Sequence, residues 1–322
     1  MADKSRKSFL TYEQQITELI QHKKLSVNCV QTAKNMLKDV GYFALIGGYK
    51  EFLRNKETRI YYSGVNFEDI VALYEFDVEL REAFFHYICK IEKKLRSIIS
   101  YEFCLLHGEQ QNEYLNRNNY NYSPKNSTPV TRKQINRLID KLDELANISK
   151  KYPYIIHQRK KYGNVPLWVL VNAIEFGSLS KMYEFFKPPL QISISKNFNA
   201  VTNAELRKFL KFMVSFRNVC AHHERFFAYK SYCSIPNTLL HKKLNIASSD
   251  MVHAYGKNDV FAVLIVFKYL LPHNDFFKLK KDINSIINKF LRKNNIITKD
   301  KLYEYMGFPQ NWERISLFRK LK

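Results

Sequence analysis

The stretch Arg217–Phe226, RNVCAHHERF, is the part of this sequence richest in side chains that could do chemistry. A histidine with a pKa of about 6.5 can accept and return a proton at the pH of the cell. An arginine stays cationic and can hold a phosphate through a planar fork of N–H donors. Together they are sufficient for metal-free cleavage of RNA. In that reaction the 2′-OH attacks the adjacent phosphorus, histidine moves a proton, and arginine stabilises the charge on the phosphoryl oxygens.

Helical geometry divides the residues around this stretch between two faces. At about 100° per residue, one apolar stripe must face the core. The stripe consists of Leu206, Phe209, Met213, Phe216, Cys220, His223 and Phe227. Because His223 lies on it, we expect a buried, hydrogen-bonded packing residue at that position.

The opposite face of the same helix is basic and contains no acid. It carries Asn218, His222 and Arg225, together with Arg207 and Lys211. We expect Arg207, Lys211 and Arg225 to contact RNA. The alternative is a solvated face with an Arg217–Glu224 pair at its edge.

Other classes of active site lack their signatures in this sequence. There is no G-x-x-x-x-G-K-[ST], G-x-G-x-x-G, G-x-S-x-G or H-E-x-x-H pattern. The adjacent His222 and His223 would diverge by about 100° on a helix and cannot easily share a metal ion. No dense group of Asp and Glu offers a two-metal nuclease site. We therefore expect neither a metal nor a small-molecule cofactor.

Two helices must position these side chains, one over residues 203–227 and an earlier one over residues 77–106. The earlier helix carries an apolar stripe at steps of three or four, formed by Phe84, Ile88, Ile91, Leu95, Ile99 and Phe103. Glu92 and Arg96 follow the favourable acid-first i,i+4 order on it, and a helix salt bridge is the alternative to a functional role. Between the two helices, residues 107–132 are polar and Asn-rich, which predicts a surface loop or insertion.

Nine glycines and nine prolines among 322 residues are few, which favours long helices and an all-α fold. We expect one large helical body without an internal linker. Residues 1–60 would form an N-terminal helical extension, residues 61–275 the core that contains the polar loop, and residues 276–322 a basic C-terminal helical extension.

The composition indicates a polyanionic partner and a cytoplasmic location. With 52 basic against 30 acidic residues, the formal net charge is +22, which attracts nucleic acid first and anionic membrane second. The alternative is an A/T-rich genome, which would also raise the content of Lys, Asn, Ile and Tyr. Five scattered cysteines and an N-terminus without an apolar signal core fit a reducing cytoplasm. The longest apolar run, VFAVLIVF, is too short to span a bilayer, so we expect no membrane partner.

The segment from Arg217 to His222 resembles the R-N-x-x-x-H form of the Arg-x(4–6)-His motif of HEPN ribonucleases. The helix around it, LRKFLKFMVSFRNVCAHHERFF, is similar to the signature helix of the Abi-like abortive-infection proteins of the AbiD/AbiF group. The segments TYEQQITELI, FDVELREAFFHYICKIEKKLRSII, VPLWVLVNAIEFGSLSKMYEFF and LYEYMGFPQNW are similar to that group in order. The resemblance runs from about Tyr12 to Trp312 and is closest to the AbiF branch.

This resemblance implies an all-helical, HEPN-like bundle with an antiphage or toxin-like role in bacteria. It implies that Arg217 and His222 are catalytic and that Asn218 orients the histidine or the phosphate. Glu92 and Arg96 would support them from an earlier helix, and His223 and Arg225 adjoin the motif itself. HEPN nucleases usually pair two copies, which implies a homodimer through the motif helix. Members of the AbiF branch are associated with a structured noncoding RNA, which is the implied partner.

Two functions from different classes are compatible with these residues. The first is a metal-independent endoribonuclease that a bound small RNA or the assembly state holds in check. The second is a non-catalytic RNA-binding or scaffold protein of an antiphage ribonucleoprotein. Arg217 and His222 point about 140° apart on a straight helix, so cleavage by one copy needs a bend or a reaching arginine. Otherwise a second copy must complete the site. Membrane attachment through the basic tail is less favoured, because no long amphipathic helix with a lipid-facing aromatic edge is present.

Overall fold

The computed structural model describes residues 8–123, 128–249, 252–294, 296–318 and 321. Seven residues of the predicted N-terminal extension, 1–7, lie outside the described residues. So do residues 124–127 of the predicted polar loop and residues 295, 319–320 and 322 of the predicted C-terminal extension.

The regular secondary structure of the described chain is helical apart from one short antiparallel pair of strands, so the prediction of an all-α fold is confirmed. π-Helical turns occupy Glu18–His22, Phe43–Gly47 and Glu144–Ile148, and the tighter 3-10 turns occupy Lys50–Phe52, Arg117–Asn119 and Trp312–Leu317. The α-helices and strands are α1 (Tyr12–Thr17), α2 (Val30–Val40), α3 (Phe67–His107), α4 (Gln111–Leu115), α5 (Pro129–Asp143), α6 (Pro153–Tyr162), α7 (Leu167–Leu170), α8 (Phe176–Phe185), α9 (Pro188–Ser195), α10 (Asn203–Ala221), α11 (Leu239–Lys243), β1 (Ser248–Ser249), β2 (Val252–His253), α12 (Val260–Leu270), α13 (His273–Lys293) and α14 (Lys299–Met306).

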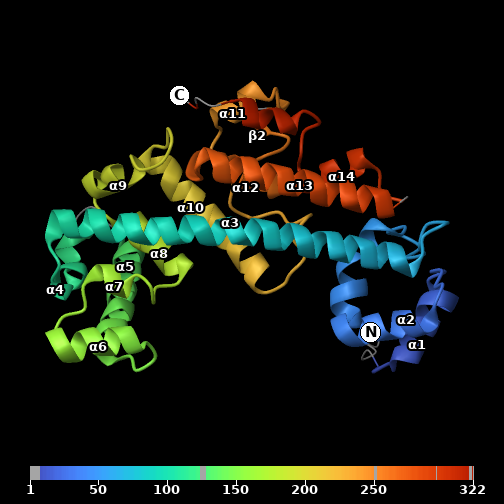
Figure 1. Ribbon diagram of the computed structural model, residues 1–322, viewed down its shortest axis with the longest axis horizontal. Helices are drawn as coiled ribbons and strands as arrows, with labels where there is room; N and C mark the ends of the chain where they lie inside the picture. The colour runs from blue at the N-terminus through green and yellow to red at the C-terminus, as the bar shows by residue number, and fades with distance from the viewer. Residues whose placement is uncertain (1–7, 124–127, 250–251, 295, 319–320, 322) are drawn as a thin grey trace.

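The 41-residue helix α3 runs along the length of the molecule, and the other elements are arranged around it (Figure 1). It begins at a capping box in which the Asn66 side chain accepts from the Asp69 amide while the Asp69 carboxylate accepts from the Asn66 amide. Helices α1 and α2 lie at its N-terminal end, and α4 to α7 gather at its C-terminal end (Figure 1). The long helix therefore connects the two ends of the molecule.

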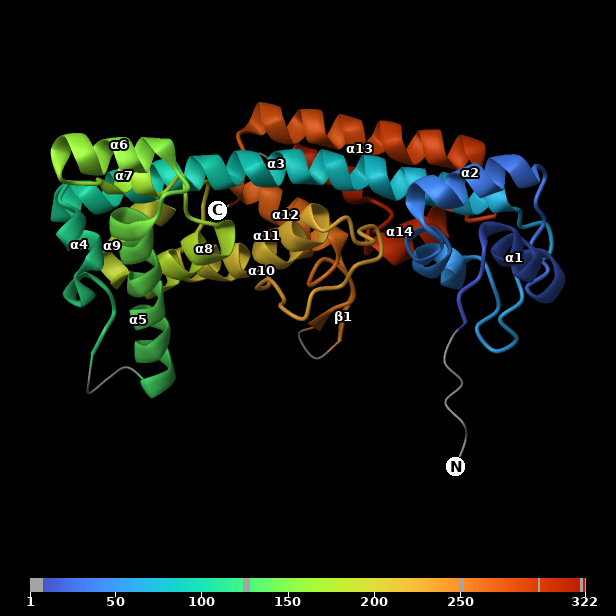
Figure 2. The ribbon, with the colours of Figure 1, turned by 90° about the horizontal axis from the view of Figure 1, so that it is seen from below.

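Two further helices pack along α3 on different sides. Helix α13 lies against α3, while α10 crosses it on the side that also carries α8 (Figure 2). Helix α10 packs in addition on α8, α9 and the wholly buried α12. The motif helix is therefore enclosed on most sides by other helices, and its free surface is narrow.

The core-facing stripe that the sequence predicts for α3 is confirmed. Every member of the stripe from Phe84 to Phe103 has an exposed fraction of 1% or less. Hydrophobic spacing is informative here because the helix is long and is covered by other helices over most of its length.

The prediction of a surface loop over residues 107–132 is wrong in part. The segment contains α4 and a 3-10 turn, and its side chains Tyr114 and Tyr120 are fully buried. Tyr114 Oη donates to the Val165 carbonyl at 2.7 Å, and Tyr120 Oη donates to the Tyr114 carbonyl at the same distance. A buried tyrosine whose hydroxyl finds a partner stabilises such a segment despite its polar composition.

Candidate functional site

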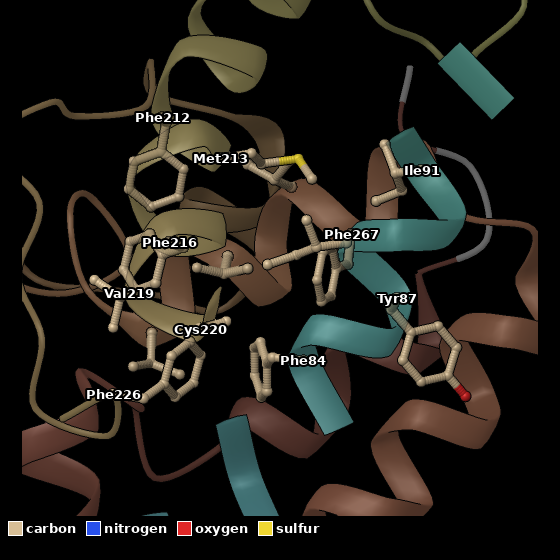
Figure 3. Close-up of a cluster of buried hydrophobic side chains, with 14 of the residues drawn as sticks. Phe84, Tyr87, Ile91, Phe212, Met213, Phe216, Val219, Cys220, Phe226 and Phe267 are labelled. Carbon is tan, nitrogen blue, oxygen red and sulfur yellow. The ribbon is translucent and has the colours of Figure 1, made fainter. Parts of the chain in front are cut away.

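The motif helix α10 is held by its cap and by its apolar stripe. Thr202 and Glu205 form a capping box at its N-terminus. The predicted stripe residues from Leu206 to Cys220 are at most 4% exposed, which confirms their inward orientation. Figure 3 shows Phe212, Met213, Phe216 and Cys220 of α10 facing Phe84 of α3 across a shared aromatic and aliphatic cluster. The packing of α10 on α3 therefore fixes where the polar side chains of the motif lie.

The helix ends earlier than its sequence pattern indicates, and this changes the position of His223. Ala221 is the last helical residue, His222 is the C-cap, and His223 adopts the left-handed conformation at φ 55°. The His223 amide donates to the Cys220 carbonyl at 3.3 Å, and the Glu224 amide donates to the Val219 carbonyl at 3.0 Å. This is the hydrogen-bond pattern of a Schellman motif, with a histidine where glycine is usual.

The prediction that His223 is a buried packing residue is therefore wrong. The side chain is exposed, because the reversal of the chain at His223 turns it away from the stripe that ends at Cys220. It borders a groove of about 200 Å³ between α3 and the end of α10, which Arg81 and Glu82 also line. His222 is exposed as well, so two imidazoles lie side by side in sequence at the helix end.

Arg217 is half-buried between α10 and α3. Its Nε atom is buried and has no hydrogen-bond partner among the described residues. Burial and the Glu92 carboxylate raise the pKa of the Cys89 thiol on α3, and the positive charge of Arg217 lowers it in part. In the described part of the chain Arg217 forms no ion pair with Glu224, whose backbone carbonyl accepts from Arg81 instead.

Glu92 and Arg96 of α3 lie in the same neighbourhood as Arg217. Arg96 donates to the Glu92 carboxylate and, at 2.9 Å, to the Ile174 carbonyl, while its buried Nε has no partner among the described residues. Arg96, like Arg217, lowers the pKa of the Cys89 thiol in part. Glu92 is only 6% exposed, so the pair is more deeply placed than an ordinary surface salt bridge. Arg217 and the Glu92–Arg96 pair therefore all lie within electrostatic range of Cys89, and Glu92 pairs directly with Arg96 alone among them.

A basic groove lies between α5 and α8. It has a volume of about 280 Å³, and its charged lining residues are Arg137, Lys141 and Lys181. Lys141 Nζ donates to the Glu175 carboxylate at 2.9 Å, and this hydrogen bond is the main reason that the pKa of Glu175 is lowered. The Arg217 charge also lowers this pKa, so Glu175 lies within electrostatic range of the motif arginine.

The remaining basic residues divide between two places. Asn218, Arg207 and Lys211 are exposed along α10, as the helical projection indicates. Arg225 does not share their face, because it follows the end of the helix. Its guanidinium donates to the Gly48 carbonyl at 2.7 Å and to the Glu51 carboxylate, and it covers the ring of Phe52.

A buried carboxylate that sequence reasoning missed holds the segment after the motif. Asp77 of α3 is fully buried and accepts from the amides of Phe226 and Phe227 and from Tyr49 Oη. Arg81, one turn later, pairs with Asp77 at 3.6 Å and donates to the Glu224 carbonyl at 3.0 Å. The acid-first i,i+4 spacing of Asp77 and Arg81, the same as that of Glu92 and Arg96, was the available signal. These two residues position the chain that carries both histidines.

Fold and site together define an all-helical protein in which α10, whose end carries two histidines, packs on the long helix α3. Buried Asp77 and Arg81 of α3 hold the segment that follows these histidines. A profile of the family described as Abi-like protein matches residues 35–228, from within α2 to just beyond the motif. The match covers more than half of the chain, and the protein belongs to this family. Membership indicates a role in abortive infection. Comparisons with curated proteins and with solved structures gave no significant match.

No group of three or more His, Cys, Asp or Glu side chains that could hold a metal ion occurs within the described ranges. Among the helices described, none is long and apolar enough to cross a membrane.

Proposed function

We propose that this Abi-like protein is a HEPN-type, metal-independent endoribonuclease. The observation that supports the proposal is that Arg217 lies on a helix packed against α3, within electrostatic range of the same thiol, Cys89, as Glu92 and Arg96, and that two exposed histidines follow it at the end of that helix. In the reaction, an imidazole accepts the proton of the attacking 2′-OH and returns it to the 5′-oxygen that leaves the phosphorus, while a guanidinium binds the phosphoryl oxygens. The products would carry a 2′,3′-cyclic phosphate and a free 5′-OH.

The exposure of His223 adds a second candidate for the proton transfer. His222 is the histidine of the R-N-x-x-x-H pattern, whereas His223 borders the groove with Arg81. Arg217 is half-buried toward α3, while both imidazoles lie beyond the helix end. We propose that a second copy, docked through the motif helix, supplies the histidine that faces Arg217 of the first.

The test compares cleavage of RNA in EDTA by wild type and by Arg217→Ala, His222→Ala and His223→Ala. His22→Ala, which removes an exposed imidazole from the turn that follows α1, is the matched control. Cyclic-phosphate products from wild type and His22→Ala, and none from Arg217→Ala, are expected. Equal RNA binding by all variants without any cleavage would overturn the nuclease and support the second candidate below.

The composite site has its own test. Arg217→Ala and His222→Ala are purified separately, mixed and assayed, with His223→Ala in a parallel mixture. If two copies share one site, one mixture regains up to about a quarter to a half of wild-type cleavage, because some mixed dimers contain one intact site. A site within one copy predicts no recovery in either mixture.

The second candidate is a non-catalytic RNA-binding protein, for which the noncoding RNA of the AbiF branch is the proposed ligand. The observation that favours it is the basic surface. Cations that are not part of the Arg217–His222 motif lie on α10, at Arg207 and Lys211, and in the groove beside Arg137. Each phosphate contact that is lost should reduce the slope of log K against log salt by about 0.7 to 1. The double variant Arg207→Ala/Lys211→Ala should therefore lower the slope by about 1 to 2, and an unchanged slope would exclude this face.

A further inference from the structure

A second cavity, remote from the Glu92–Arg96 cluster, lies where the N-terminal and C-terminal parts of the chain meet. It has a volume of about 470 Å³ and lies between the segment that follows α2 and helix α14. This volume falls within the range of about 300–1,000 Å³ that is usual for small-molecule sites. The match to the Abi-like family ends well before α14, so the family match covers only one side of the cavity.

Three aromatic rings form one part of its lining. Phe52 and Tyr305 meet edge to face with ring centroids 4.8 Å apart, and both are half-buried. Tyr62 lines the same cavity and is 50% exposed. Partly exposed aromatic faces that converge on one cavity can stack on a flat heterocycle.

Charged groups form the rest of the lining. Lys56 is exposed and makes no ion pair within the part of the chain that the structure describes. Lys301 Nζ pairs with the Glu304 carboxylate at 2.9 Å, and Glu51 contributes a second carboxylate from the opposite side. Lysine is suited to a phosphate, and carboxylates accept hydrogen bonds from the amino groups of a base.

We propose that this cavity binds a nucleotide, with the base against the aromatic rings and the phosphate against Lys56. The nucleotide is either free or an unstacked unit of single-stranded RNA, because both present the same base and phosphate. The site is separate from the proposed nuclease centre and does not depend on it.

The cavity is connected to the motif through the side chains that line it. The Phe52 ring lies under the guanidinium of Arg225, with 4.9 Å between the ring centroid and Cζ, and its centroid is 4.8 Å from that of Phe227. Arg225 and Phe227 follow His222 by three and five residues. An occupant that contacts Phe52 or Glu51 therefore touches the groups that hold the segment after the motif. Binding is expected to slow hydrogen exchange in residues 222–227.

Isothermal titration of the full chain tests the proposal, with AMP, GMP, CMP, UMP and ribose 5-phosphate as probes. A tetranucleotide of single-stranded RNA is titrated in parallel at 0.3 M salt. Tyr62→Ala and Lys56→Ala are each expected to weaken binding about tenfold, and both positions are exposed enough to leave the fold intact. Tyr101→Ala and Lys278→Ala remove an exposed tyrosine and an exposed lysine elsewhere and should change nothing.

The results of these titrations distinguish a free nucleotide from an RNA strand as the ligand, and they can also exclude both. Tight mononucleotide binding that depends on Tyr62 supports a free nucleotide, and binding of the tetranucleotide alone with the same dependence supports an RNA strand. No binding of any probe, binding unaffected by both substitutions, or ribose 5-phosphate bound as tightly as the nucleotides overturns it. Arg217→Ala should bind the probes as wild type does, so a failure of the nuclease proposal leaves this result interpretable.

Discussion

Substitution of His223 by glycine is expected to stabilise the protein, although it removes an entire imidazole. His223 has φ 55° at the position after the C-cap of α10, and its side chain is exposed. The left-handed conformation costs a non-glycine residue about 1–2 kcal/mol, whereas glycine adopts it freely but loses about 0.5–1 kcal/mol more chain entropy on folding. The difference predicts a gain of about 0.5–1 kcal/mol in the free energy of unfolding.

Urea denaturation of His223→Gly and His222→Gly tests this reasoning. His222 has φ −95°, so glycine there relieves no strain and should lower the free energy of unfolding by about 0.5 kcal/mol. A loss of about 2 kcal/mol or more in His223→Gly, the scale of an emptied core site, would refute the account of the helix end. The same variant separates stability from chemistry, since slower cleavage by a more stable protein would place His223 in the reaction.

Three further substitutions test other parts of the structure by urea denaturation. Asp77→Ala should lower the free energy of unfolding by about 3–5 kcal/mol, because two backbone amides and the buried Arg81 lose their partner. A decrease below about 1 kcal/mol would contradict the role of Asp77. Burial lowers the pKa of His241 to about 4, whereas an unfolded histidine has a pKa of about 6.5. The folded protein therefore keeps its full stability above about pH 6.5, and the free energy of unfolding falls by about 3 kcal/mol as the pH decreases toward 4. His241→Gln should show a smaller decrease in the free energy of unfolding between pH 7 and 4 than wild type. An identical pH dependence in both proteins would argue against a lowered pKa of His241. Arg225→Ala should lower the free energy of unfolding by about 1 kcal/mol through the lost contacts with Glu51, Gly48 and Phe52, whereas no change would mean that these contacts are not formed in solution.

The long helices and their buried faces could be predicted from the sequence because their spacing is regular. The stripe from Phe84 to Phe103 and that from Leu206 to Cys220 are both buried as expected. The Glu92–Arg96 pair could also be found from its spacing, but its proximity to Arg217 depends on the packing of α10 on α3.

The end of α10 could not be predicted, because no glycine or proline marks it. A histidine takes the left-handed position at which glycine normally signals a helix end. The apolar spacing in the sequence therefore continues through His223 to Phe227, although the helix has already ended at Ala221. The contact of Asp77 with Phe226 joins residues 149 positions apart, and nothing local in the sequence specifies it. For the same reason the helical projection predicts Arg225 on the basic face of the helix, whereas it lies beside Glu51.

The most direct measurement of the central claim uses one RNA oligonucleotide that wild type cleaves in EDTA. The same oligonucleotide is prepared with a single 2′-deoxy nucleotide on the 5′ side of the cut. The proposed chemistry predicts that this one change abolishes cleavage at that bond and leaves binding intact, since the attacking 2′-OH is missing. Cleavage of both oligonucleotides at the same bond and rate would contradict the proposal that Arg217 and a histidine promote attack by the 2′-OH.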